Sequence, residues 1–239
     1  MSSHGITKVV VSKGITSIGN NVFGEGCSSI LSISLPDGLT EIGGYTFEGC
    51  SSMTTINLPW GLVNIGNYAF VSCRSLEKIE IPSSITEIKL STFYECKSLK
   101  TVILPKNLLI LGTSAFEGCQ SLENITIPAS VTTINKYAFK DCESLKKVQI
   151  PNGFTSINEY VFSGCESLTE VILPESMEKL NEGVFEDCKS LESIKLPAAI
   201  SKIHADAFAG CRKLETIYVT SGSYAEKWAK NNAYTAVVE

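Results

Sequence analysis

A strict 23-residue period in the cysteines and prolines constrains this chain more than any other feature of its sequence. All nine cysteines stand 23 residues apart, from Cys27 to Cys211, and all eight prolines keep the same interval. From Phe47 onward a phenylalanine precedes each cysteine by three residues, and Phe23 alone is displaced by one residue. Only an internal tandem repeat places every member of two residue types on one period, so the sequence predicts a repeat protein.

Two further columns of the repeat are apolar in every unit. The third position after proline holds Leu39, Leu62, Ile85, Leu108, Val131, Phe154, Met177 and Ile200, and the sixth holds Ile42, Ile65, Ile88, Leu111, Ile134, Ile157, Leu180 and Ile203. Both columns are predicted to be buried, since no polar residue occurs in them. The positions between them vary freely, as solvent-facing positions do.

Each unit is predicted to form one coil of a stack. In "LKTVILP", residues 99–105, Val102 and Leu104 alternate with Thr101 and Ile103, which predicts a short strand that ends at the proline. The segment "STFYEC", residues 91–96, is predicted to form a single helical or 3-10 turn that points its phenylalanine and cysteine inward. Stacking such coils places the strands side by side in a parallel sheet.

The repeated pattern L-x-x-[IV]-x-[IL]-P-x-x-[IL]-x-x-[IL]-x-x-x-[ATV]-F-x-x-C closely resembles the BspA-like leucine-rich repeat family, from Ile6 to Val219. The resemblance implies an α/β repeat fold: a right-handed leucine-rich-repeat solenoid with short parallel strands on its concave face and helical or 3-10 turns on its convex side. The asparagine that follows the strand in commoner leucine-rich repeats is absent here, and the Pro-x-x-[IL] step takes its place.

The whole chain, residues 1–239, is expected to be one solenoid. Residues 1–29 form an irregular first repeat, residues 30–219 the regular repeats, and residues 220–239 a C-terminal cap. In the cap, Ser223 and Glu226 match a capping box for a short helix that carries Tyr224 and Trp228. Trp228 is therefore predicted to close the core and not to bind a ligand.

Bulk properties exclude several partners. The net charge of −5, with both signs interspersed, argues against a nucleic-acid surface, which requires clustered Lys and Arg. No run of eighteen apolar residues occurs, so no membrane insertion is expected. The start "MSSHGITK" lacks the apolar stretch of a secretory signal, which fits either a cytosolic protein or a processed or trimmed chain, and we expect the second. The family resemblance implies an extracellular or cell-surface location; the sequence leaves the oligomeric state open.

No arrangement of residues predicts catalysis, a cofactor or a metal site. No two cysteines are closer than 23 residues, unlike zinc ligands, and equivalent side chains in stacked coils point the same way and not toward each other. We therefore predict that Cys96 and its equivalents are buried, unpaired thiols used for packing. Ser98 and its equivalents lack a histidine partner, so they are expected to satisfy backbone groups at the turn and not to act as nucleophiles.

With the inward positions committed to packing, function must use the outward ones. We call the two outward columns of the strands the ribbon, which consists of Lys8 and Val10, Ser32 and Ser34, Thr55 and Asn57, Lys78 and Glu80, Thr101 and Ile103, Asn124 and Thr126, Lys147 and Gln149, Glu170 and Ile172, Ser193 and Lys195, and Thr216 and Tyr218. At strand spacing this ribbon is roughly 45 Å long, which is sufficient for a standard protein–protein interface.

Nine residues are candidates for partner binding. Four are apolar on an otherwise polar ribbon, four are charged ribbon residues, and one is a tryptophan at a variable position after proline: Val10, Ile103, Ile172 and Tyr218; Lys78, Glu80, Lys147 and Glu170; and Trp60. The apolar four could serve as interface anchors, although scattered exposed apolar residues are also normal. The pairs Tyr45 and Tyr68, and Tyr137 and Tyr160, are expected to stack on each other between adjacent coils.

The sequence thus predicts a non-catalytic scaffold that binds protein. The family resemblance adds adhesion to host matrix proteins or other cells, as a surface module of a bacterium or a parasitic protist. Two alternatives stay open: a structural spacer or surface-layer component without a dedicated partner, and an accessory domain of a larger enzyme.

Overall fold

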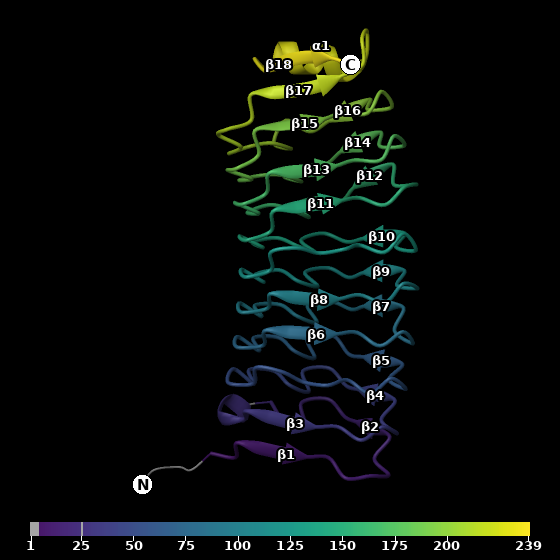
Figure 1. Ribbon diagram of the computed structural model, residues 1–239, viewed down its shortest axis with the longest axis vertical. Coiled ribbons are helices and arrows are strands. Elements are labelled where there is room, and N and C mark those ends of the chain that lie inside the picture. Colours follow the sequence, from purple (N-terminus) through teal and green to yellow (C-terminus); the bar gives the residue numbers. More distant parts are fainter. Residues whose placement is uncertain (1–4, 25) are drawn as a thin grey trace.

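The computed structural model, which describes residues 5–24 and 26–239, is an elongated stack of coils (Figure 1). The first coil and the C-terminal helix lie at opposite ends of the stack. His4 and the rest of the first four residues, like Glu25, lie outside the described residues. Each coil has three sides: a strand in front of the proline, a two-residue strand after it, and a wall of turns in front of the cysteine.

The first side carries the predicted parallel strands. They are β1 (Lys8–Val10), β3 (Ser32–Ser34), β6 (Lys78–Glu80), β8 (Thr101–Ile103), β11 (Lys147–Gln149), β13 (Glu170–Ile172), β15 (Ser193–Lys195), β17 (Thr216–Val219) and β18 (Thr235–Val238). Their register is that of the repeat, so that Glu80 lies beside Ile103 and Gln149 beside Ile172. The ladder is interrupted at Thr55 and Asn124, each of which forms only an isolated bridge to the next coil.

The second side is a row of two-residue strands that the sequence did not predict. They are β2 (Ser17–Ile18), β4 (Glu41–Ile42), β5 (Asn64–Ile65), β7 (Glu87–Ile88), β9 (Ile110–Leu111), β10 (Thr133–Ile134), β12 (Ser156–Ile157), β14 (Lys179–Leu180) and β16 (Lys202–Ile203). All of their pairings are parallel and keep equivalent residues side by side. Each strand ends on the buried residue six positions after proline, or its equivalent Ile18 in the first coil.

The third side corrects the predicted helical or 3-10 turns. The single 3-10 helix among the described residues, η1 (Cys27–Ser29), begins at a cysteine instead of ending there. In front of each cysteine the chain forms consecutive turns, which we call the turn wall (residues 45–49 and their equivalents). Tyr45 and Glu95 show the reason, because their φ angles of 55° and 59° lie in the left-handed region and rule out a continuous helix.

The backbone hydrogen bonds between coils in the turn wall all run in one direction. The backbone N–H groups of Tyr45, Phe47 and Gly49 donate to carbonyl oxygens of the following coil at 3.1, 2.8 and 2.9 Å. The same three-residue pattern repeats from residues 68, 70 and 72 and from the equivalent residues of later coils. The first and last residues of the wall, such as Tyr45 and Gly49, have positive φ, and the wall satisfies its N–H groups by bonds to the next coil and not by helical bonds.

The core is a set of columns that run the length of the stack. The predicted third and sixth columns after proline are buried with one exception, Phe154, which is half-buried. Phenylalanine rings stack face to face from Phe23 to Phe208 with neighbouring centroids 5.1–5.8 Å apart, so Phe23 joins the stack despite its displacement in sequence. Ile6, at the beginning of the first coil, is exposed.

The C-terminal segment packs on the last coil of the core. Helix α1 (Tyr224–Asn231) begins after Ser223, whose hydroxyl accepts a hydrogen bond from the Glu226 N–H at 3.1 Å. The Trp228 ring packs on Phe208 at 5.8 Å and on Tyr234 at 5.4 Å, and thereby ends the phenylalanine stack. Strand β18, which the sequence analysis did not predict, then pairs in parallel with β17.

Candidate protein-binding surface

The ribbon forms as predicted on the first side of the stack. In β3, β6, β8, β11 and β13 both outer residues are exposed and the central residue is buried. The alternation follows from strand geometry, which sends successive side chains to opposite faces. Strand β18 extends the ribbon by Thr235 and Val237, two exposed or partly exposed residues that the sequence analysis missed. The β-branched run "TAVV" was the available signal for this strand.

The apolar candidates all lie in the second outward column, nearer the proline. The exposed fractions are 64% for Val10, 41% for Ile103 and 37% for Ile172, whereas Tyr218 is half-buried between Lys195 and Val237. Ile103 and Ile172 are separated by three strand steps, or about 14 Å. The structure therefore presents isolated apolar side chains at intervals along the ribbon and not one apolar patch.

The three charged ribbon residues in the C-terminal half, Lys147, Glu170 and Lys195, all have ion-pair partners. Lys147 Nζ lies 2.6 Å from Glu170 Oε1, and Lys195 Nζ lies 2.9 Å from Glu239 Oε2. Lys78 and Glu80 have no ion-pair partner among residues 5–24 and 26–239. Exposed ion pairs contribute little to stability, so a partner can break the Lys147–Glu170 and Lys195–Glu239 pairs at a small cost in free energy. Lys78 and Glu80 are available without breaking any pair among the described residues.

Three of the sequence candidates meet in one hollow. Trp60 borders the ribbon, and with Lys78, Glu80, Asp37 and Asn57 it lines a hollow of about 410 Å³. The sequence had placed Trp60 away from the strands, but its position directly after Pro59 brings it into the same hollow as the ribbon residues Thr55 and Asn57. The other candidates are distributed along the ribbon and do not converge.

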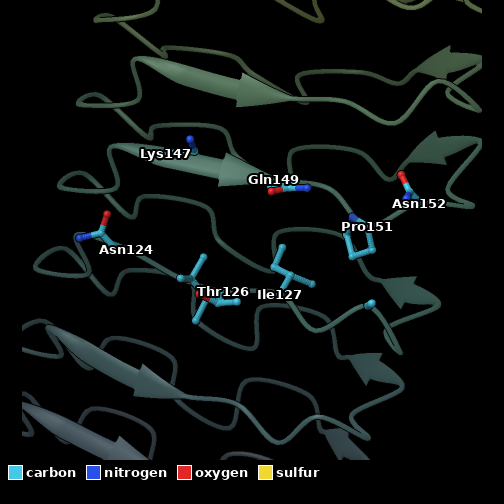
Figure 2. A pocket seen from close by; sticks show the side chains of 9 residues that line it. Asn124, Thr126, Ile127, Lys147, Gln149, Pro151 and Asn152 are labelled. Carbon is cyan, nitrogen blue, oxygen red and sulfur yellow. The ribbon is translucent and has the colours of Figure 1, made fainter.

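A second hollow of about 400 Å³ lies three repeats further along, at the equivalent positions. Figure 2 shows Lys147 and Gln149 on β11, with Asn124 and Thr126 on the neighbouring coil. Both hollows occur where the strand ladder is interrupted, at Thr55 and Asn124. The position occupied by Trp60 in the first hollow is Ala129 in the second, so only the first has an aromatic wall.

The tyrosine pairs stack between coils, as predicted. The ring centroids of Tyr45 and Tyr68 are 4.6 Å apart, and those of Tyr137 and Tyr160 are 5.5 Å apart. A hydrogen bond of 2.6 Å from the Tyr160 hydroxyl to the Glu182 carboxylate raises the pKa of Tyr160 to about 12. These contacts account for the tyrosines without a ligand.

The cysteines are packing residues, as predicted. All nine are free and buried. From Cys73 onward each thiol donates to the phenylalanine carbonyl of the preceding coil, for example Cys96 Sγ to Phe70 O at 3.2 Å and Cys119 Sγ to Phe93 O at 3.3 Å. Burial raises the pKa of both thiols above the ordinary value, which keeps them protonated and unreactive. In the part of the chain that the structure describes, no group of three or more His, Cys, Asp or Glu could hold a metal ion.

The repeated serines act differently from the prediction. None of the hydroxyls at Ser98 and its equivalents forms a hydrogen bond with residues 5–24 or 26–239, whereas the Ser98 backbone N–H donates to Arg74 O at 3.1 Å. Ser98 is half-buried, so its hydroxyl remains open to water. At this position the backbone N–H, and not the predicted hydroxyl, makes the hydrogen bond.

Thiol labelling tests the packing role. In native buffer at neutral pH we expect fewer than about one thiol per chain to react with a disulfide reagent within minutes, because the thiolate is the reactive form and burial disfavours it. In strong denaturant all nine cysteines should react. A freshly reduced sample that gives appreciably fewer than nine in denaturant would show that some thiols are already bonded.

The fold is a solenoid of stacked parallel strands built from leucine-rich-repeat coils. Scaffolds of this class are consistent with a role in protein interaction. The chain belongs to the BspA-type leucine-rich repeat family, since the family model, described as BspA type leucine rich repeat region (6 copies), matches residues 1–123 and again residues 109–231. No curated protein matches the chain in sequence. No helix of the described residues has both the length and the apolarity that crossing a membrane requires.

Solved structures of bacterial leucine-rich repeat proteins are similar over nearly the whole chain. A leucine-rich cell-surface protein of Faecalibacterium prausnitzii is 25% identical, with a TM-score of 0.52, and the match covers 98% of this chain and 88% of that one. A leucine-rich repeat protein of Bacteroides ovatus is 24% identical, with a TM-score of 0.57 and coverage of 98% and 84%. The pneumococcal vaccine antigen PcpA is 19% identical, with a TM-score of 0.59 and coverage of 98% and 79%, which shows a shared fold.

Proposed function

We propose that this protein is a non-catalytic scaffold that binds another protein through its ribbon, as a cell-surface or secreted adhesion module. The observation that carries the proposal is the division of roles within each coil. Every column that points inward is filled by packing residues, while the second outward column exposes Val10, Ile103 and Ile172 to solvent. Exposed apolar groups amid polar neighbours are the usual anchors of protein interfaces.

The cell-surface part of the proposal is supported by the family and by one relative. The similar protein of F. prausnitzii is described as a cell-surface protein, and its match covers most of both chains. Buried reduced thiols are compatible with such a location in an environment without oxygen. We propose host matrix or cell-surface proteins as the partner class, and the whole of residues 1–239 as one solenoid.

A pull-down with matched variants tests the proposal. The purified chain is exposed to extracellular-matrix and cell-surface extracts, beside a ribbon variant with Ile103→Ser, Ile172→Ser and Tyr218→Ser. The control variant carries Leu31→Ser, Val63→Ser and Leu109→Ser, which changes three exposed apolar residues outside the ribbon. We expect the native chain and the control to retain a protein that the ribbon variant loses by about tenfold or more.

The alternatives predict other outcomes of the same experiment. Retention of one partner by all three proteins would place binding on another surface. Retention of nothing by any of them would favour the structural spacer, which has no dedicated partner. Circular dichroism must first show that both variants remain folded.

A further inference from the structure

Trp60 is exposed without a structural reason. Its side chain is 68% exposed, and no aromatic ring of the described residues stacks on it. The same position after proline holds small, polar or charged residues in the other units: Asp37, Ser83, Lys106, Ala129, Asn152, Glu175 and Ala198. The coil therefore folds without an aromatic residue there, and the indole presents a large apolar face to solvent.

Two unpaired carboxylates flank this indole. Asp37 occupies the equivalent position one coil earlier, so it lies about one strand spacing from Trp60 along the stack. Glu80 lines the same hollow from the second outward column of β6. Neither carboxylate has an ion-pair partner in residues 5–24 and 26–239, in contrast to the paired Glu170. Lys78 lies at the other end of β6, two residues further from the proline, which leaves the indole end of the hollow acidic.

We propose that the Trp60 hollow receives an arginine side chain of the protein partner. A guanidinium stacks on an indole face and donates hydrogen bonds in a plane, so it suits an indole with carboxylates on both sides of it. An anionic ligand is disfavoured by the carboxylates. A neutral sugar ring also stacks on tryptophan, but it gains less from two ionised acids. The assignment rests on the proposed protein-binding function and specifies one contact of that interface.

Nuclear magnetic resonance with small probes tests this assignment directly. The chain has two tryptophans, so the indole N–H signals of Trp60 and Trp228 are resolved, and the largely packed Trp228 serves as the internal reference. The probe is the blocked tripeptide Gly-Arg-Gly, compared with the same peptide containing citrulline, which has nearly the same shape without the charge. We expect the arginine peptide to shift the Trp60 signal to saturation and to bind at least about tenfold more tightly than the citrulline peptide.

Variants then identify the carboxylates. Glu80→Gln and Asp37→Asn should each weaken the arginine peptide about threefold to tenfold. Glu166→Gln, which changes an exposed carboxylate outside the ribbon that already has Lys189 as its partner, should leave the affinity of the arginine peptide unchanged. All three residues are exposed, so the substitutions are not expected to affect folding.

The contrary results are equally specific. An absent Trp60 shift, equal binding of the citrulline peptide, or a stronger response to methyl glucoside would overturn the assignment. The last result would identify a carbohydrate site instead. None of these outcomes affects the pull-down, which tests binding through Ile103, Ile172 and Tyr218. The protein-binding function and the arginine contact can therefore be disproved independently.

Discussion

Raising the pH from about 8 to about 10 is expected to unfold the solenoid. Six interior thiols are fully buried, and their loss of hydration raises the pKa of each above its ordinary value: Cys73, Cys96, Cys119, Cys142, Cys165 and Cys188. In an unfolded chain these thiols ionise at a pH of about 8.5. Above that pH the folded state retains protons that the unfolded state has released, so stability is fully present below it and falls as the pH rises.

The expected loss is large because the thiols act together. Each contributes at most about 1.4 kcal/mol per pH unit between its unfolded and its folded pKa, so six contribute at most roughly 8 kcal/mol per unit. The total stability of a typical domain is about 5–15 kcal/mol, so the effect is sufficient to unfold the chain. Lysine and tyrosine side chains stay mostly protonated below a pH of about 9.5 and contribute little to the loss in that range.

Urea unfolding at several pH values measures this effect. Free energies of unfolding between about pH 7.5 and 9.5, taken with a phosphine reductant present, give a slope that reports the number of protons released. In a control with Cys96→Ala, Cys119→Ala and Cys142→Ala, the slope should be about half of the native one, whatever the starting stability. If the free energy of unfolding of the native protein fell by less than about 3 kcal/mol per pH unit, the six thiols would not all be protonated and buried in the folded state.

Phe116→Ala is expected to destabilise the protein by about 3–5 kcal/mol. Its ring is fully buried and stacks on Phe93 at 5.3 Å and on Phe139 at 5.6 Å. Truncation leaves a cavity in the middle of a continuous column, and coils on both sides lose packing. In a stacked array, stability depends on contacts between neighbours, so the gap also weakens the coupling between the two halves.

Phe154→Ala is the matched control for this substitution. Phe154 is half-buried and lies outside the phenylalanine stack, so the same truncation should cost clearly less, about 1–2 kcal/mol. Urea unfolding followed by circular dichroism measures both variants. Equal losses at the two positions, or a loss below about 1 kcal/mol for Phe116→Ala, would show that the stack does not govern stability.

The inward half of the fold was predictable from the sequence because the repeat samples each position many times. A column that holds only Leu, Ile, Val, Met or Phe reports burial far more reliably than any one residue. The alternation around Val102 similarly located the strands and the ribbon. Trp228 was predictable as a cap because it follows the last repeat and a capping box.

The turn wall was not predictable from periodicity, which has no signal for backbone handedness. Glycine recurs directly before the cysteine at Gly49, Gly118, Gly164 and Gly210, all with positive φ, and this recurrence was the available hint. Glu95 and Asp141 adopt the same conformation without glycine, because the bonds between coils hold them there. The two-residue strands were not predicted for a related reason. They form because neighbouring coils pair in the stack, and not because their residues have a high local strand propensity.

The candidate site was predictable only in part. The sequence identified Trp60, Lys78 and Glu80 as separate candidates, but it gave no sign that they share a hollow. Their convergence depends on the interrupted ladder at Thr55, which is a property of the stack. The absence of an ion pair at Glu80 likewise becomes visible only when the neighbouring coils are in place.

The one-way hydrogen bonds of the turn wall give the solenoid a polarity. In each coil the N–H groups at residues such as Phe47 and Phe93 point toward the following coil, and the carbonyl groups point toward the preceding one. Within the turn wall the aligned peptide dipoles add, as they do in an α-helix, with the positive end toward the C-terminus. Further coils extend this wall only in the same direction. Helix α1 and Trp228 cover the C-terminal end of the stack, so the one-way pattern begins and ends within a single chain.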